Sequence, residues 1–328
     1  MKILVTGGAG YIGSHVVKQL GLRDEDEITI IDNLSTGFES SILFGKLVKM
    51  DLSDYSAVID FFAINKFDAV IHFAAKIVVP ESVEKPIMYY MNNTANTANL
   101  IGAASQGGVK HFIFSSTAAV YGDSQSGIVS EDNEKIPLNP YGHSKLMSEQ
   151  ILRDTAISNP DFKFVILRYF NVAGASIDCS IGQRTPEATH LIKVACETVV
   201  GKRDCMSIYG EDYPTEDGTC VRDYIHIEDL ASAHLAALEY LKEGGESDIF
   251  NCGYGKGFSV KEVIETMKKV SGIDFLVKNA PRRDGDAAKL ISTNNKILGK
   301  LKWNIKYNDL ELICKTALLW EKKLQNIK

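Results

Sequence analysis

The chain has 328 residues, of which 45% are hydrophobic and 24% are charged, and its formal net charge is −6. This composition is typical of a folded globular protein, and the length predicts two domains or one large domain with a cap. The acidic balance and the absence of a basic run argue against a nucleic-acid partner. No apolar run approaches the roughly 18 residues of a membrane span, so we expect no membrane association.

The N-terminus and the cysteines indicate a cytoplasmic protein. Residues Met1–Thr6 enter a strand-like run directly, without the layout of a signal peptide. The six cysteines include no Cys-x-x-Cys pair, so we predict no metal site. Free thiols in a reducing compartment are the simplest account of them.

Apolar, strand-like runs alternate with helix-length segments in the first half of the chain. The runs cover Lys2–Thr6, Glu27–Ile31, Leu47–Met50, Ala69–Phe73, His111–Ser115 and Phe164–Leu167. The helical segments between them cover Ile12–Leu22, Tyr55–Asn65, Pro86–Ser105 and Tyr141–Ser158. Six nearly all-apolar strands that alternate with helices predict an α/β fold with a doubly wound parallel sheet of the Rossmann type.

The pattern loosens after about residue 171, where glycines and acidic loops increase. Helices are predicted there at Ala188–Val200, Ile227–Leu241, Val260–Val270 and Asp309–Gln325. We expect a Rossmann domain over residues 1–171 and a smaller α/β substrate-binding domain over residues 172–328. Since no flexible linker separates them, we expect some later segments to pack back on the first domain and a cleft to lie between the two.

A glycine-rich loop follows the first predicted strand. Gly8, Gly10 and Gly13 match G-x-G-x-x-G, and Gly7, Gly10 and Gly13 match the related G-x-x-G-x-x-G spacing. Glycines permit a tight turn, and the N–H groups that begin the next helix bind a pyrophosphate. Alone, such a pattern also fits a simple structural turn. Asp32 ends the second strand, where a carboxylate accepts from the adenosine ribose and repels a 2′-phosphate, so NAD is favoured over NADP.

Tyr141 and Lys145 lie one turn apart on a helix that Asn139 is expected to cap and Pro140 to begin. A phenol with a pKa near 10 is a poor base at neutral pH, and a nearby ammonium group favours the phenolate. An exposed helix pair is the alternative for this spacing alone. Following a dinucleotide loop, the pair predicts a general base and its tuning cation.

Three hydroxyl residues, Ser115, Ser116 and Thr117, end the fifth predicted strand. Ligands of open α/β sheets bind at the carboxyl ends of strands, so these hydroxyls are placed to contact a reacting alcohol or carbonyl. The alternative is that they satisfy backbone groups, which suffices for Ser115 or Ser116 more readily than for all three.

These motifs resemble the extended short-chain dehydrogenase/reductase family and, within it, the UDP-glucose (UDP-galactose) 4-epimerases. The resemblance covers nearly the whole chain. Four second-half motifs narrow it to these epimerases, namely Arg168–Ala175, Asp212–Thr219, Arg222–His226 and Ala280–Asp286.

The resemblance implies an NAD cofactor, a UDP-hexose substrate and a homodimer. It assigns the cofactor to Gly7, Gly10, Tyr11, Ile12, Gly13, Asp32, Asn33, Leu34, Ser35, Thr36, Gly37, Asp51, Leu52, Phe73, Ala74, Ala75, Asn92, Ser115, Tyr141, Lys145 and Phe170. It assigns the nucleotide sugar to Thr117, Tyr141, Asn171, His190, Leu191, Ser207, Ile208, Tyr209, Arg222, Arg283, Asp286 and Leu290. The planar guanidinium groups of Arg222 and Arg283 also suit a diphosphate on chemical grounds.

The same resemblance implies an isomerase. Tyr141 takes the 4-hydroxyl proton while the C4 hydride passes to NAD⁺, with Lys145 tuning the base and Thr117 bonded to the 4-hydroxyl. The resulting 4-keto sugar turns about its diphosphate, and the proton and hydride return to its other face. The alternatives are a UDP-uronate epimerase or decarboxylase, a nucleotide-sugar dehydratase and a non-catalytic NAD-binding sensor.

Several positions depart from the family's pattern. Thr117 stands where Ser is common, and His190 stands where Asn is frequent. Many members have a Lys that contacts the cofactor at the position of Ile77, whereas Lys76 lies one residue early and receives no role. Leu290 is smaller than the Tyr of strict glucose/galactose enzymes, which predicts some activity on UDP-GlcNAc and UDP-GalNAc. The alternative is that Leu290 is simply a core residue.

Overall fold

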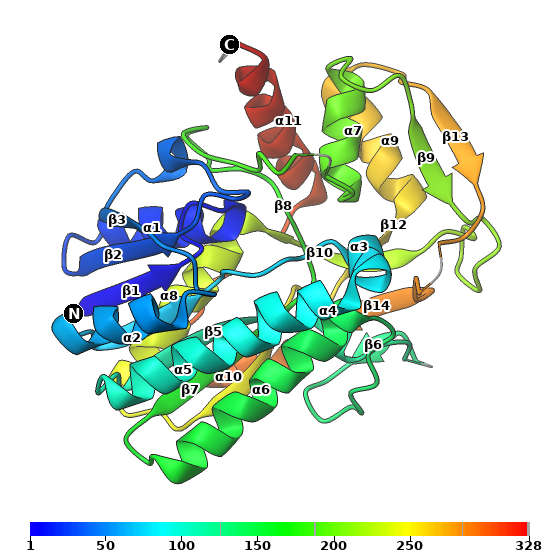
Figure 1. The fold of residues 1–328 in the computed structure, drawn as a ribbon. Coiled ribbons are helices and arrows are strands. Elements are labelled where there is room, and N and C mark those ends of the chain that lie inside the picture. The colour runs from blue at the N-terminus through cyan, green and yellow to red at the C-terminus, as the bar shows by residue number, and fades with distance from the viewer. Residues whose placement is uncertain (125, 187, 284, 327–328) are drawn as a thin grey trace.

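A seven-stranded parallel sheet forms the larger part of the computed structural model, which describes residues 1–124, 126–186, 188–283 and 285–326 (Figure 1). Its strands are β1 (Lys2–Thr6), β2 (Glu27–Asp32), β3 (Lys46–Lys49), β4 (Ala69–His72), β5 (His111–Thr117), β7 (Lys163–Tyr169) and β11 (Asp248–Cys252). Their order is β11-β7-β5-β4-β1-β2-β3, and every pairing is parallel. The predicted doubly wound α/β fold is therefore confirmed.

Helices cover both faces of this sheet because its strands are apolar on both sides. Along β1, Ile3 and Val5 pack into one buried cluster and Leu4 into another, as the period of two requires. The first cluster lies under α1 (Tyr11–Gly21) and α8 (Ile227–Lys242), which contact each other. The second lies under α2 (Tyr55–Ile64), α5 (Asn96–Gln106) and α6 (Pro140–Ser158).

The expectation of six strands in the sheet, all from the first half, was wrong. The seventh strand, β11, adds to the edge at β7 with Phe250 paired to Leu167, and α8 covers the sheet beside α1. Both elements follow residue 171. The short run at 248–252 begins with an aspartate, so its pattern alone did not reveal a strand whose partner lies about 80 residues earlier.

The segment predicted as one helix over Pro86–Ser105 is interrupted. A short helix α4 (Pro86–Tyr89) leads into a π-helical turn over Tyr90–Ala95 and then into α5. A π-helical turn contains one extra residue, which changes the face on which the following side chains lie. This change matters for Asn93, as the site shows.

The smaller part of the molecule contains two short sheets and three helices. One sheet joins β12 (Gly257–Ser259), β10 (Val221–His226), β14 (Lys289–Ser292) and β6 (Ile128–Val129), with β8 (Asn171–Ala173) paired to β10. The other pairs β13 (Val277–Ala280) with β9 (Met206–Tyr209). Helices α7 (Leu191–Val199), α9 (Val260–Ser271) and α11 (Leu310–Asn326) pack beside them, while α3 (Val79–Glu84) and α10 (Asn295–Lys300) complete the named helices.

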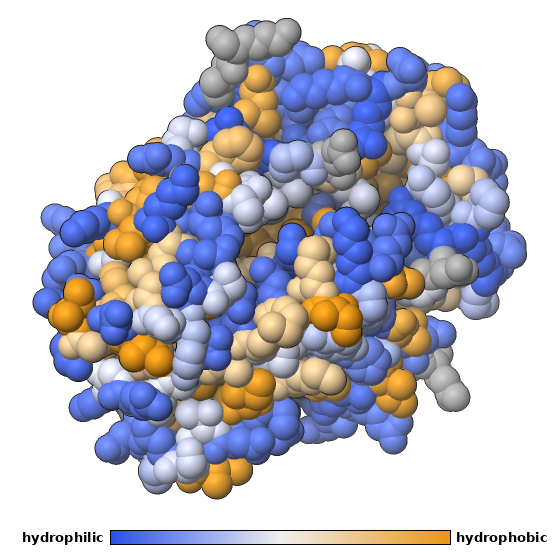
Figure 2. All heavy atoms as spheres, viewed as in Figure 1, coloured by the Kyte–Doolittle hydropathy of each residue, from blue (hydrophilic) through white to orange (hydrophobic). Residues whose placement is uncertain are grey.

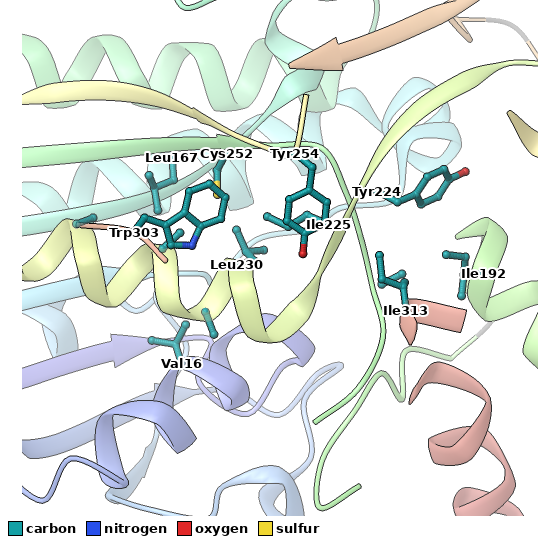
Figure 3. Close-up of a cluster of buried hydrophobic side chains, with 14 of the residues drawn as sticks. Val16, Leu167, Ile192, Tyr224, Ile225, Leu230, Cys252, Tyr254, Trp303 and Ile313 are labelled. Carbon is teal, nitrogen blue, oxygen red and sulfur yellow. The ribbon is translucent and has the colours of Figure 1, made fainter. Parts of the chain in front are cut away.

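The two parts share one apolar core. Figure 3 shows Leu167 of the large sheet, Leu230 of α8, Tyr224 of β10 and Ile313 of α11 in a single buried cluster. Figure 2 shows the surface hollowed between the two parts, above the carboxyl ends of the large sheet's strands. The division at residues 171 and 172 stays a prediction. Within the described ranges, every helix falls short of the length and apolarity that a bilayer span requires.

Four histidines lie inside this core and its helix layer, namely His15, His72, His226 and His234. Burial lowers their pKa values, to about 3 for His15 and His72 and to about 4 for His226 and His234. His72 is held between the hydroxyls of Thr6 and Thr97, at 2.6 and 2.9 Å.

These histidines predict loss of stability in mild acid. Between about pH 6.5 and pH 4 the unfolded chain binds protons that the folded chain does not. As the pH is lowered through this range, the free energy of unfolding therefore decreases by up to about 1.4 kcal/mol per pH unit for each histidine. Denaturant titrations at pH 7 and pH 5 measure the effect, and His234→Gln is expected to reduce the slope. An unchanged free energy of unfolding between these pH values contradicts the prediction.

Candidate active site

The glycine loop connects β1 to α1 with very little space around its backbone. Gly7 has φ +72°, and a Cβ there would lie 2.6 Å from the Ala74 nitrogen. A Cβ on Gly13 would lie 2.3 Å from the Gly7 oxygen. The first helical bond of α1 runs from the Ser14 N–H to the Gly10 oxygen, so the preceding N–H groups lie at the helix N-terminus, where a pyrophosphate binds. The predicted residues Tyr11 and Ile12 begin this helix.

Asp32 fastens the end of β2 to the glycine loop. Its carboxylate accepts hydrogen bonds from the N–H groups of Ala9 and Leu34, at 2.9 and 2.8 Å. Gly37 returns the following loop to Ala9, whose side chain leaves no room for a Cβ on this glycine. The loop that contains Asn33, Leu34, Ser35 and Thr36 therefore runs beside the predicted phosphate site.

Asp51 and Leu52, which the resemblance places at adenine, follow β3. The Asp51 carboxylate accepts from Asn33 Nδ2 at 2.7 Å and from the Ser53 N–H at 2.8 Å. Hydrogen bonds from Ser53 and Asn33 lower the pKa of Asp51. Leu52 is buried in the second apolar cluster. The structure thus brings Asp51 to the Asn33 end of the cofactor loop.

Phe73, Ala74 and Ala75 follow β4 and pass beside the glycine loop. The Phe73 N–H donates to the Thr6 oxygen at 2.9 Å, and Ala74 is the residue that a Cβ on Gly7 would strike. These residues therefore share an edge of the sheet with the phosphate site, as predicted for a cofactor channel.

Asn93, which the sequence did not single out, connects the Phe73–Lys76 segment to helix α6, which carries the predicted base. Its amide pairs with the Lys76 backbone, at 2.8 Å to the nitrogen and 2.9 Å to the oxygen, and donates to Ser144 Oγ at 3.1 Å. Ser144 Oγ donates in turn to the backbone carbonyl oxygen of Tyr141 at 2.7 Å. The predicted Asn92 lies beside it and donates to Asn93 Oδ1 at 2.9 Å. The adjacent asparagines were a signal, but only the π-helical turn decides which one points inward.

Tyr141 and Lys145 are both buried on the first turns of α6, at 7% and 3% exposure. Asn139 caps this helix through the Gly142 N–H, at 2.9 Å, and Pro140 occupies its first turn, so the predicted helix start is confirmed. Lys145 Nζ donates to the Ser115 oxygen at 2.9 Å. The structure therefore brings the predicted base and cation to the end of β5.

Burial dominates the protonation of both groups. It raises the pKa of Tyr141 to about 12, although a hydrogen bond with Thr117 acts in the opposite direction. It lowers the pKa of Lys145 to about 7, opposed by the Glu149 carboxylate. The protein alone therefore favours the neutral form of the phenol. The positive charge of an oxidised nicotinamide, when bound, favours the phenolate and so couples cofactor binding to base function.

The three hydroxyls that end β5 have different surroundings. Ser115 Oγ lies 2.7 Å from the Tyr169 hydroxyl, and Thr117 accepts from the Ala119 N–H at 3.1 Å and bonds to Tyr141. Ser116 instead donates to Glu149 Oε1 at 2.6 Å. Glu149 is buried in a two-point ion pair with Arg168, at 2.9 and 2.5 Å. Ser116 therefore contacts the Glu149–Arg168 ion pair rather than the phenol.

The predicted substrate residues lie on strands of the smaller part and at the start of α7. Arg222 of β10 pairs in register with Leu290 of β14, and its guanidinium lies 3.7 Å from the Asp286 carboxylate. The Arg283 guanidinium stacks 3.7 Å from the ring centre of Tyr209. The remaining predicted residues are Asn171 on β8, His190 and Leu191 at α7, and Ser207 and Ile208 on β9. Asp284 of the same motif lies outside the described residues.

Phe170 and Leu290 connect the residues at the end of β5 with the predicted substrate residues of the smaller part. Phe170, predicted near the nicotinamide, is buried in a small cluster with Ala118 and Val120, and Leu290 packs against this cluster. Ala118 follows Thr117 directly. Leu290, which is predicted to limit the size of the sugar, therefore lies next to the end of β5, close to Thr117 and Tyr141.

The chain is similar to known proteins over nearly its whole length. The profile of the NAD dependent epimerase/dehydratase family matches residues 3–253. A UDP-glucose 4-epimerase of Azospirillum brasilense is 49% identical over 325 residues, covering 99% of this chain and 93% of that protein. The UDP-Glc/GlcNAc 4-epimerase of Campylobacter jejuni is 58% identical in structural alignment, with a TM-score of 0.86 and coverage of 98% and 99%. The UDP-glucose 4-epimerase of Bifidobacterium longum, solved with NAD⁺ and UDP, is 35% identical with a TM-score of 0.93 over 99% of both chains.

The crowding at Gly13 predicts that Gly13→Ala impairs cofactor binding. Since the new Cβ would lie 2.3 Å from a backbone oxygen, the loop must shift, and we expect NAD affinity to fall at least about tenfold, or about 1.4 kcal/mol. NAD released from the denatured, purified protein measures the effect. Gly299→Ala in α10 is the matched control, because its Cβ meets open space. Equal NAD content in both variants contradicts the prediction.

Proposed function

The chain belongs to the NAD dependent epimerase/dehydratase family, and we propose that it inverts C4 of a UDP-hexose, interconverting UDP-galactose and UDP-glucose with bound NAD. The observation that carries this proposal is the buried group of Tyr141, Lys145 and Thr117 at the end of β5. A buried phenol bonded to a hydroxyl, with a buried lysine one helical turn away, can move a proton to and from an alcohol. The named relatives, two of which are called UDP-glucose 4-epimerases, support the choice of substrate.

In the proposed reaction the chain moves one proton twice. Tyr141 accepts the proton of the sugar 4-hydroxyl, which Thr117 orients, while bound NAD⁺ supplies the chemistry that removes and returns the C4 hydride. The 4-keto sugar then turns about its diphosphate, and Tyr141 gives the proton back to the other face. Lys145 would hold the nicotinamide ribose, and its charged form would favour the phenolate.

Two arginines suit the turning step. The guanidinium groups of Arg222 and Arg283 lie on the strands and loops of the smaller part, away from Tyr141, and suit a diphosphate. In the proposed complex they hold the UDP while the sugar end changes its orientation.

The alternatives fit the site less well. A dehydratase needs a carboxylic acid beside the catalytic hydroxyl to expel water, and Thr117 is followed by Ala118 and Ala119. A pure NAD sensor needs neither a phenol nor an ammonium group. Burying both of these polar groups costs stability, which is typical of a catalytic site.

We expect Tyr141→Phe to lose roughly 10²–10⁴ of the turnover rate, because the general base is removed while the ring is kept. Conversion of UDP-galactose, followed by chromatography without added cofactor, measures the rate, and released NAD shows that the site is intact. Tyr55→Phe is the matched control, since Tyr55 is exposed on α2. Full conversion by Tyr141→Phe would contradict the role of Tyr141 as the base, whereas a wild-type protein that converts no UDP-galactose would favour the sensor or another reaction.

We further propose that the enzyme accepts N-acetylated sugars. Leu290 lies against the cluster beside Thr117, where a bulkier side chain would take space from a sugar substituent. The related Campylobacter jejuni protein, named a UDP-Glc/GlcNAc 4-epimerase, supports this range.

Leu290→Tyr is therefore expected to lower kcat/KM for UDP-GalNAc relative to UDP-galactose by about tenfold or more, the size of steric discrimination in such pockets. Leu290→Met, which conserves volume, is the control and should preserve the ratio. Parallel assays of the two sugars measure it. An unchanged ratio in Leu290→Tyr contradicts the role of Leu290.

We propose a homodimer formed through the helices at α3 to α6. Val83, Ile87 and Met91 are exposed along α3, α4 and the π-helical turn, and Met147 is exposed on the adjacent α6. Figure 2 shows apolar residues over this face. Exposed apolar side chains gathered on neighbouring elements are typical of an interaction surface, and a second copy matches the expectation for this family.

The double variant Ile87→Asp, Met91→Lys is expected to shift the mass in light-scattering chromatography from two chains to one, because it places charges in the proposed contact. Ile64→Asp, at an exposed position on α2, is the control and should leave the mass unchanged. A wild-type protein that elutes as a monomer overturns the proposal.

We propose a cytoplasmic location. The six cysteines all lie in the described residues, and each is a free thiol in the structure. Free thiols suit a reducing compartment.

A further inference from the structure

A buried glutamine holds the ring of His190, one of the proposed substrate residues. Gln183 Nε2 lies 3.1 Å from His190 Nδ1. Gln183 is only 8% exposed, whereas His190 keeps partial exposure at the N-terminus of α7. The ring therefore has Nδ1 held by a buried side chain, while the residue as a whole keeps partial exposure.

The backbone of Gln183 is fixed by α11. The indole N–H of Trp320 donates to the Gln183 oxygen at 3.1 Å. The same indole ring lies so close to Gly182 that a Cβ there would be 2.5 Å from it, and Gly182 also forms a β-bridge with Ala175. Because both sides of Gln183 are constrained, its amide meets the histidine ring in a defined position.

This contact determines where the histidine proton lies. A side-chain NH₂ group donates hydrogen bonds and has no lone pair with which to accept one. Nδ1 of His190 is therefore the acceptor, and the single proton of the neutral ring lies on Nε2. Burial also lowers the pKa of His190, which favours the uncharged ring at neutral pH.

We propose that Gln183 is a positioning residue that holds His190 as the Nε2–H tautomer, so that His190 offers an uncharged N–H donor to the bound nucleotide sugar. This inference rests on the proposed function. It also accounts for the histidine at a position where the resembling family often has Asn. An asparagine amide offers an N–H donor as well, so the tautomer selected by Gln183 preserves that donor in a different side chain.

The tautomer is tested without any substrate. In ¹⁵N-histidine spectra of the NAD-bound protein, assigned with a His190→Asn variant, we expect Nδ1 of His190 at the shift of an unprotonated ring nitrogen and Nε2 at that of an N–H. Gln183→Leu replaces the amide donor by an apolar side chain, and in this variant both resonances should move toward the tautomer average. A protonated Nδ1 in the wild-type protein overturns the inference.

A double-mutant cycle tests the link to substrate. Gln183→Leu is expected to raise KM for UDP-galactose about threefold to tenfold, the size of one lost hydrogen bond, with kcat changed less than about twofold. In the His190→Asn background the effect of Gln183→Leu on KM should disappear, because the asparagine does not need a tautomer to be selected. An equal rise of KM in both backgrounds shows a merely structural role and overturns the inference.

The two proposals fail in different ways. If wild-type protein with its NAD does not convert UDP-galactose, the proposed function is wrong, while the spectra still report the tautomer. If conversion is normal and the spectra or the cycle give the contrary result, only the role of Gln183 is wrong. Bound NAD and the melting temperature of each variant confirm that it is folded.

Discussion

The burial of one phenol and one amine at the end of β5 is the constraint on which the rest of the site depends. Tyr141 and Lys145 are removed from water, and burial drives each toward its uncharged form. A working base at this position needs positive charge close by. The fold holds Lys145 against the Ser115 oxygen, and an oxidised cofactor, when bound, would supply positive charge that favours the phenolate. The phenolate form of the proposed base would thus be most populated when the hydride acceptor is in place.

Two hydrogen-bond networks hold Tyr141 and Lys145 in position. The Asn93 amide connects the cofactor channel at Lys76 to Ser144 and so to the first turn of the catalytic helix. On the other side, the Arg168–Glu149 pair binds α6 to β7 and fixes Ser116. Both connections are buried hydrogen-bond networks. They hold the geometry because each buried group left without its partner would lower the free energy of unfolding by roughly 1–3 kcal/mol. The strands that carry the predicted substrate residues share one apolar core with the large sheet.

The sequence predicted what local chemistry determines. The glycine loop, Asp32 and the capped helix at Asn139 follow from backbone geometry and capping, and each lies where predicted. It did not predict β11, because that pairing depends on a contact between distant segments, nor the π-helical turn, which places Asn93 rather than Asn92 inside. The balance of burial and charge at Tyr141 also needed the structure, since a Tyr and a Lys four residues apart have the same spacing whether exposed or buried. The pairing of Gln183 with His190 is likewise tertiary.

The central claim is that hydride leaves C4, stays in the protein and returns to the same carbon. The most direct test uses UDP-galactose deuterated at C4, in ordinary water and without added cofactor, with the UDP-glucose product examined by NMR. The account predicts that the product keeps its deuterium at C4, since hydride held by the cofactor does not exchange with solvent while the Tyr141 proton does. Loss of the deuterium to water would mean that C4 is deprotonated instead, and would contradict the account.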